Sequence, residues 1–143
     1  MASGFNHPIH RVAWPDTLRT LEFGPYFNQP VDRVKWPPVL SSLTFGYHFD
    51  RPVHNARWPP ALEYIRFGYS FNQPIAGIVW PGTIKKFGLG VCFDQPLDGV
   101  RWPSSLQTLA YETESFADPL PEIPGVQVVR FAINLEFLLH PDR

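Results

Sequence analysis

The sequence contains a single cysteine, Cys92, among its 143 residues. One cysteine cannot form a disulfide bond within the chain, so packing and hydrogen bonds must hold the fold together. Residues 1–4 also contain no apolar run of the kind found in a secretion signal. These two absences favour a cytoplasmic environment.

Long apolar runs and excess charge are both missing. One of the 17 prolines interrupts every apolar run before it reaches the length of about 18 residues that a bilayer-spanning helix needs. The formal net charge is −1, so the chain has no overall field that would attract it to nucleic acid or to an anionic membrane. We therefore expect neither nucleic acid nor a membrane among its partners.

Motifs for metal or cofactor binding are missing as well. The five histidines, at positions 7, 10, 48, 54 and 140, show no metal-ligand spacing, and only one cysteine could join them. No glycine-rich loop precedes a helix in the way that phosphate binding requires. We expect no metal, no nucleotide and no other cofactor.

A repeat of 22 residues dominates what the sequence does contain. Its five tryptophans recur at this period and each is followed by proline: Trp14, Trp36, Trp58, Trp80 and Trp102. Five phenylalanines keep the same period: Phe5, Phe27, Phe49, Phe71 and Phe93. A period of about 20 to 50 residues indicates a solenoid or a repeat array.

Each unit contains the pattern Leu-x-x-Leu-x-Phe-Gly, in which apolar residues alternate before a glycine. Such alternation predicts a short strand. The expected strands are 19–23, 41–45, 63–67, 85–89, 107–111 and 127–131. Gly24, Gly46, Gly68 and Gly90 follow four of them, and we attribute these glycines to unusual backbone dihedral angles. Paired prolines in the rest of each unit exclude a long helix.

Stacked units would place equivalent side chains in columns. We expect inward columns of Leu18 and Leu21 type and a buried aromatic column of Phe27 type. The tryptophan column should lie at the edge of the core with each ring N–H beside a carbonyl or water, although a ligand-stacking ladder is the alternative. The residue after each phenylalanine is Asn or Asp, which predicts side-chain bonds to nearby backbone amides that stabilise the turn.

The segments Phe27-Asn28-Gln29-Pro30-Val31 and Phe71-Asn72-Gln73-Pro74-Ile75, each preceded by the Leu-x-x-Leu-x-Phe-Gly pattern, resemble the FNIP repeat. That family is related to leucine-rich repeats. Tryptophan stands where FNIP repeats usually have Ile or Leu before the second proline, so this chain resembles a Trp-Pro variant. The resemblance implies a mainly β, right-handed, curved solenoid with one parallel sheet of about six strands and little or no α-helix. It also implies a protein-interaction module.

The domain organisation follows from where the repeat is regular. Residues 1–17 form an N-terminal half-repeat or cap, and residues 18–112 hold the regular units. The register slips in residues 113–143, where Phe116 comes 23 residues after Phe93. We expect this segment to form a degenerate last repeat and a C-terminal cap, all within one domain.

Function should depend on positions that the repeat leaves free, chiefly outward residues of the strands. We place Thr20, Glu22, Ser42, Thr44, Tyr64, Arg66, Lys86, Gly88, Thr108, Ala110, Val128 and Arg130 there. A candidate protein-binding face consists of Tyr64, Arg66, Lys85, Lys86, Glu22 and Thr44, which would suit an acidic or phosphorylated partner. The alternative is a solvated sheet face without a ligand.

The loops after the strands offer a second surface, a candidate rim of Tyr26, Tyr47 and Tyr69 beside His48, Ser70 and Cys92. Ser70 could hydrogen-bond to His48 on the neighbouring turn, but neither has an identifiable orienting carboxylate or oxyanion donor. We therefore predict no enzyme. The expected function is a non-catalytic scaffold that binds a protein through the strand face. The alternative is a structural solenoid, or a piece of a longer array, that self-associates through its ends.

Overall fold

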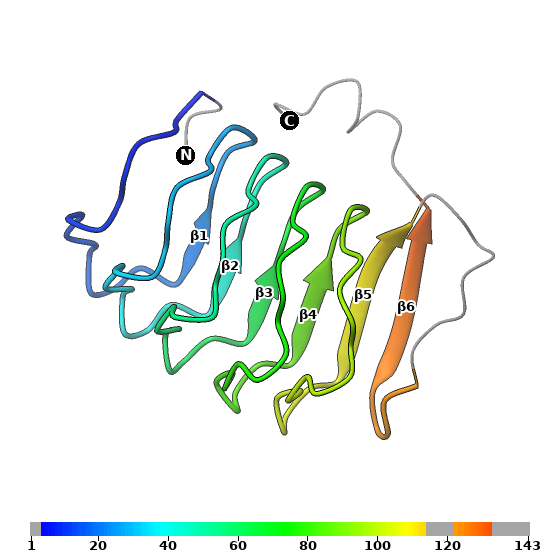
Figure 1. Cartoon of the computed structure of the whole chain (residues 1–143). Coiled ribbons are helices and arrows are strands. Elements are labelled where there is room, and N and C mark those ends of the chain that lie inside the picture. Colours follow the sequence, from blue (N-terminus) through cyan, green and yellow to red (C-terminus); the bar gives the residue numbers. More distant parts are fainter. Residues whose placement is uncertain (1–3, 114–121, 133–143) are drawn as a thin grey trace.

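The computed structural model describes residues 4–113 and 122–132, and this part of the chain forms one parallel sheet without a helix. The strands are β1 (Thr20–Glu22), β2 (Ser42–Thr44), β3 (Tyr64–Arg66), β4 (Lys86–Leu89), β5 (Thr108–Thr113) and β6 (Gln127–Ala132). They stand side by side in chain order, and a loop returns from each strand to the next (Figure 1). The expected six-strand solenoid is confirmed.

The register between neighbouring strands follows the 22-residue period as far as β5, where Lys86 pairs with Thr108. Between β5 and β6 the spacing shortens, and Thr108 pairs with Gln127. Val128 therefore lies opposite the inward Leu109, and Arg130 lies opposite Tyr111. The prediction that Val128 and Arg130 point outward is wrong, because the last unit is three residues shorter and side chains alternate along a strand.

The core lies on the inner side of the sheet in columns of equivalent side chains. Leu21, Leu43, Ile65, Phe87 and Leu109 form one column, and all five are buried. The Leu18 column is also confirmed, with Leu18 half-buried at its end and Leu40 and Leu62 fully buried. Because each column continues from turn to turn, every turn buries its apolar side chains against its neighbours.

Two phenylalanine columns fill the centre of the coil. Rings of the Phe27 type stack with their centroids 6.1 Å apart from Phe5 to Phe71, and Phe93 follows at 6.3 Å. A second column runs beside it, with Phe45 at 5.5 Å from Phe23 and 5.4 Å from Phe67. The two columns contact each other at about 4.1 Å within a turn, as between Phe67 and Phe71. This double column extends the predicted aromatic spine.

The tryptophan column is stacked, with 6.2 Å between the rings of Trp36 and Trp58 and 5.5 Å between those of Trp58 and Trp80. The ring nitrogens of Trp14, Trp36, Trp58 and Trp80 are buried and have no hydrogen-bond partner. The prediction of a carbonyl or water beside each ring N–H is therefore wrong. Phenylalanine rings are instead edge-on neighbours, as Phe45 is to Trp58 at 6.3 Å.

The Asn and Asp column joins successive turns. The Oδ1 atom of Asn28 accepts a hydrogen bond of 2.9 Å from the backbone N–H of Asp50, and Asp50 Oδ1 accepts one of 2.9 Å from Asn72 N–H. The side chain of Gln73 also donates to Asp50 Oδ1 at 2.9 Å. We predicted bonds within each turn, and the structure corrects this: each side chain caps the amide of the following turn, 22 residues on.

The glycine column has a different cause from the one predicted. Positive φ angles occur at Gly77, Gly99 and Gly125 and not at the glycines that follow the strands. A Cβ atom on Gly68 would lie 2.1 Å from the carbonyl oxygen of Gly46, a separation that no real contact allows. These glycines are therefore required because neighbouring turns approach each other closely there, not because of their dihedral angles.

Candidate functional site

The sheet face is the outward surface of the strands, and the register arranges its side chains in two rows. One row follows the first strand positions: Thr20, Ser42, Tyr64, Lys86, Thr108 and Gln127. The other follows the third: Glu22, Thr44, Arg66, Gly88, Ala110 and Val129. The sheet therefore brings Tyr64 beside Lys86, and Thr44 between Glu22 and Arg66.

Arg66 has a partner that the sequence did not indicate. Its Nη2 atom donates to Oε1 of Glu112 on β5 at 2.5 Å, although the two residues are 46 positions apart. Glu112 was read only as the residue that interrupts the glycine column. The structure places it within β5, which continues to Thr113, so its carboxylate is available to Arg66.

Lys85 is also paired, because its Nζ atom lies 3.2 Å from Oε1 of Glu63 on the preceding turn. Both side chains are about half exposed, so this ion pair contributes little stability. Among the described residues, Lys86 has no carboxylate partner. The predicted cluster of cations is therefore partly neutralised by its own face, and Lys86 is its unpaired member.

The rim residues form two neighbouring stacks instead of one row. Tyr47 and Tyr69 stack at 4.5 Å with an interplanar angle of 4°. Tyr26 stacks on His48 at 5.2 Å, and the ring of Tyr47 meets that of His48 edge-on at 4.8 Å. Tyr26 thus belongs to the column of His48 and not to that of the other tyrosines, as the 22-residue spacing requires.

The His48, Ser70 and Cys92 column shows how the rim is held and not a catalytic arrangement. The backbone N–H of Ser70 donates to Tyr47 O at 3.0 Å, and that of Cys92 donates to Tyr69 O at 3.0 Å. In the part of the chain that the structure describes, no hydrogen bond joins the Ser70 hydroxyl to the His48 ring. Cys92 is exposed.

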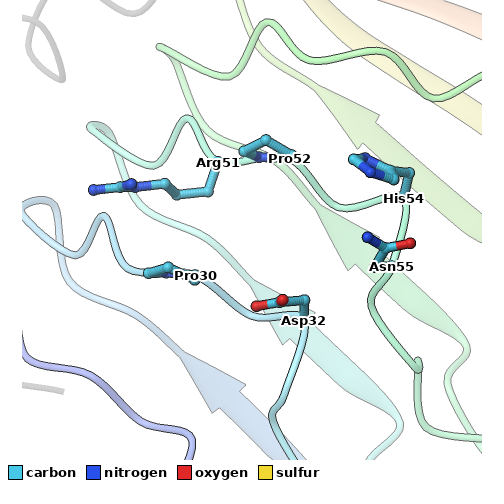
Figure 2. Close-up of a pocket in the computed structure, with 6 residues that line it drawn as sticks. All are labelled: Pro30, Asp32, Arg51, Pro52, His54 and Asn55. Carbon is cyan, nitrogen blue, oxygen red and sulfur yellow. The ribbon is translucent and has the colours of Figure 1, made fainter.

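A shallow cavity of about 180 Å³ lies on the loop side of the coil, between two successive turns (Figure 2). Its lining residues are Pro30, Asp32, Arg51, Pro52, His54 and Asn55. Arg51 is fixed by a bond of 3.0 Å from its Nε atom to Asn28 O. The volume is below the range of about 300–1,000 Å³ typical of small-molecule sites.

A second cavity, of about 440 Å³, shares Pro30 and Asp32 with the first and continues to Pro8, His10, Gln29 and Arg33. Neither cavity contains a residue of the predicted binding face or rim. No group of three potential metal ligands is found within residues 4–113 and 122–132. The same residues contain no helix that could span a membrane.

Comparison with known proteins agrees with this architecture. Residues 5–48 match the family model described as FNIP Repeat, so the resemblance expected from the sequence is confirmed there and the chain carries FNIP repeats. No curated protein matches the chain.

Among solved structures, the chain is similar to CroV588, described as a novel circular LRR protein, with a TM-score of 0.61 and 24% sequence identity. The match covers 90% of this chain but 22% of that protein, so the chain spans less than a quarter of its length. At this identity the likeness shows the fold alone. The protein is thus an FNIP repeat solenoid with a fold like that of leucine-rich repeats.

Proposed function

We propose that the protein is a non-catalytic scaffold that binds another protein through its sheet face, and that it acts in the cytoplasm as one repeat domain. The observation that supports this best is the contrast between columns. Inward and loop columns repeat the same residue types and are occupied by packing or by bonds between turns. The outward rows vary from strand to strand and stay accessible to a partner.

The middle of the sheet face is the part best suited to recognition. Tyr64 supplies an aromatic ring of intermediate exposure, and Lys86 on the next strand supplies an exposed charge without a carboxylate partner among the described residues. Tyrosine and cationic side chains are frequent among residues that dominate binding energy. An acidic segment of a partner would meet Tyr64, Arg66 and Lys86 together. Glu22, Thr44 and the paired Lys85 complete the surface around them.

The test compares the doubly reversed variant R66E/K86E with K35E/R57E. Lys35 and Arg57 are exposed and precede Trp36 and Trp58, away from the strands, so the control makes the same charge change on a different side. A protein recovered from native extract by the original chain should be retained by K35E/R57E and lost by R66E/K86E. Titration of the purified pair by calorimetry should give the same order. Equal affinity for both variants would refute the proposed face.

Self-association is a second candidate, favoured by the two edges of the sheet. The strand order leaves β1 and β6 with one neighbour each among the described strands. Because Arg19 O and Phe23 N–H bond toward β2, the backbone groups of Thr20 and Glu22 face the open edge. Light scattering at two protein concentrations tests this: a mass that rises with concentration supports stacking, and a constant monomer mass excludes it.

A further inference from the structure

We propose that Arg66 and Lys86 form a site for a phosphate group carried by a partner segment, and that Glu112 competes with this group for Arg66. The proposal rests on the sheet face as the binding surface and specifies the chemistry recognised there. Glu112 would act as an internal stand-in for the ligand, holding Arg66 in place while the face is empty.

The path of the Arg66 side chain is the first observation. To reach Glu112 on β5, Arg66 on β3 must cross β4, and the residue beside it on β4 is Gly88. A Cβ atom on Gly88 would lie 3.0 Å from Cγ of Arg66, so the arginine rests directly on the glycine backbone. The next residue in that row, Ala110, is also small. The two small residues therefore leave a track along which the arginine lies.

The weakness of the ion pair is the second observation. The side chain of Arg66 is 44% exposed, and a single nitrogen of its guanidinium contacts the carboxylate. Exposed ion pairs with such geometry are easily broken because water competes for both groups. Within the described residues the other guanidinium donors have no acceptor, so they can bind a second anion. The side chain of Glu112 is 19% exposed and stays on the sheet when the arginine moves.

The chemistry of the freed arginine favours phosphate over carboxylate. A guanidinium binds phosphate through two parallel hydrogen bonds, and a phosphate monoester carries up to two charges and three acceptor oxygens. Such a group can engage both Arg66 and the unpaired Lys86. A single carboxylate has to replace the equivalent carboxylate of Glu112 without this gain. Tyr64, beside Lys86, would contact the chain that carries the phosphate.

The experiment is an NMR titration of the full chain with inorganic phosphate, with a short phosphoserine peptide and with acetate. We expect phosphate to shift the amide resonances of Gly88 and Ala110 and to bind more tightly than acetate. The phosphopeptide should bind at least as tightly as free phosphate. R66Q should weaken binding by about tenfold or more, because charge-assisted hydrogen bonds are lost. K35Q, which removes a charge elsewhere, should have no effect.

Two variants test the role of Glu112. E112Q should raise the affinity for phosphate by about two- to fivefold, the range expected from loss of an exposed ion pair. Gly88→Ala should also raise it, since the added methyl displaces Arg66 from its track without any change of charge. Thermal unfolding of each variant, followed by circular dichroism, checks that the fold is kept.

Phosphate affinities that are unchanged in both E112Q and Gly88→Ala would overturn the competition, whatever the partner proves to be. Absence of phosphate-induced shifts at Gly88 and Ala110 in all variants would overturn the phosphate site itself. If a partner is nevertheless lost by R66E/K86E, the sheet face remains the binding surface and recognises other chemistry. Tighter binding of free phosphate than of the phosphopeptide would exclude a partner segment as the source.

Discussion

The regular turns and the last turn of this solenoid differ in where the strand ends. Strands β1 to β3 contain three residues each and β4 contains four, whereas β5 and β6 contain six. Gly24, Gly46, Gly68 and Gly90 follow the first four strands, and Glu112 stands at the same repeat position in β5. Where glycine is present the turns close tightly on each other and pairing stops, and where it is absent the sheet continues.

This difference has a functional side. Because β5 extends past the position where the other strands end, Glu112 lies on the sheet and reaches Arg66. In a regular turn the same position would be a glycine without a carboxylate. The irregular end of the array thus supplies the group that modifies its regular middle.

The largest predicted effect tests whether the middle turns carry the stability. Phe49 stacks on Phe27 and Phe71 and contacts Phe45 at 4.2 Å, while Phe93 is half-buried at the end of the column. Phe49→Ala should lower the free energy of unfolding by about 3–5 kcal/mol, as large buried aromatic truncations do. Phe93→Ala should cost clearly less. Urea denaturation followed by circular dichroism measures both, and equal losses would contradict the comparison.

The next effect tests the glycine column. Gly68→Ala places a Cβ atom 2.1 Å from Gly46 O, a backbone atom that can move only if two turns separate. We expect a loss of about 3 kcal/mol, at the upper end of the cost of overpacking. Gly82→Ala, where the nearest atom is the Ser104 hydroxyl at 3.3 Å, and E112A should each change stability little. A tolerated Gly68→Ala in the same urea series would refute the close approach as the cause.

The smallest effect concerns the hydrogen-bond column. Asn72 Oδ1 accepts bonds from Asp94 N–H at 2.8 Å and from the Gln95 side chain at 3.1 Å. Asn72→Ala leaves both donors without this acceptor and should cost about 1–2 kcal/mol. N72D keeps an acceptor oxygen and should retain most of the stability, with a small loss that salt removes because Asp50 and Asp94 flank it. Thermal unfolding with and without salt measures this, and equal losses in the two variants would exclude the bond.

Much of the fold could be predicted because the repeat supplies the same evidence several times. The Leu21 and Phe27 columns follow directly from their period, and the strands fall where the alternation predicts them. The last unit could not be placed in this way. Its spacing shortens from 22 to 19 residues, and a shift by an odd number of residues turns Val128 and Arg130 to the other side.

The candidate site was less accessible to sequence reasoning. Tyr64, Arg66 and Lys86 are placed on one face by their strand positions alone. The pairing of Arg66 with Glu112 depends on the length of β5 and on the small residue at position 88, neither of which the period specifies. Whether the six residues of the predicted face bind a partner stays a prediction.

The sequence by itself determined the coil: the period, the inward columns and the hydrogen-bonding column are local patterns that repeat, so each unit specifies its own turn. Only the tertiary structure decided how the turns meet. The close approach of Gly46 and Gly68, the isolation of the tryptophan N–H groups and the reach of Arg66 across β4 all depend on distances between turns. Such distances arise from the packing of whole units, and no single unit encodes them.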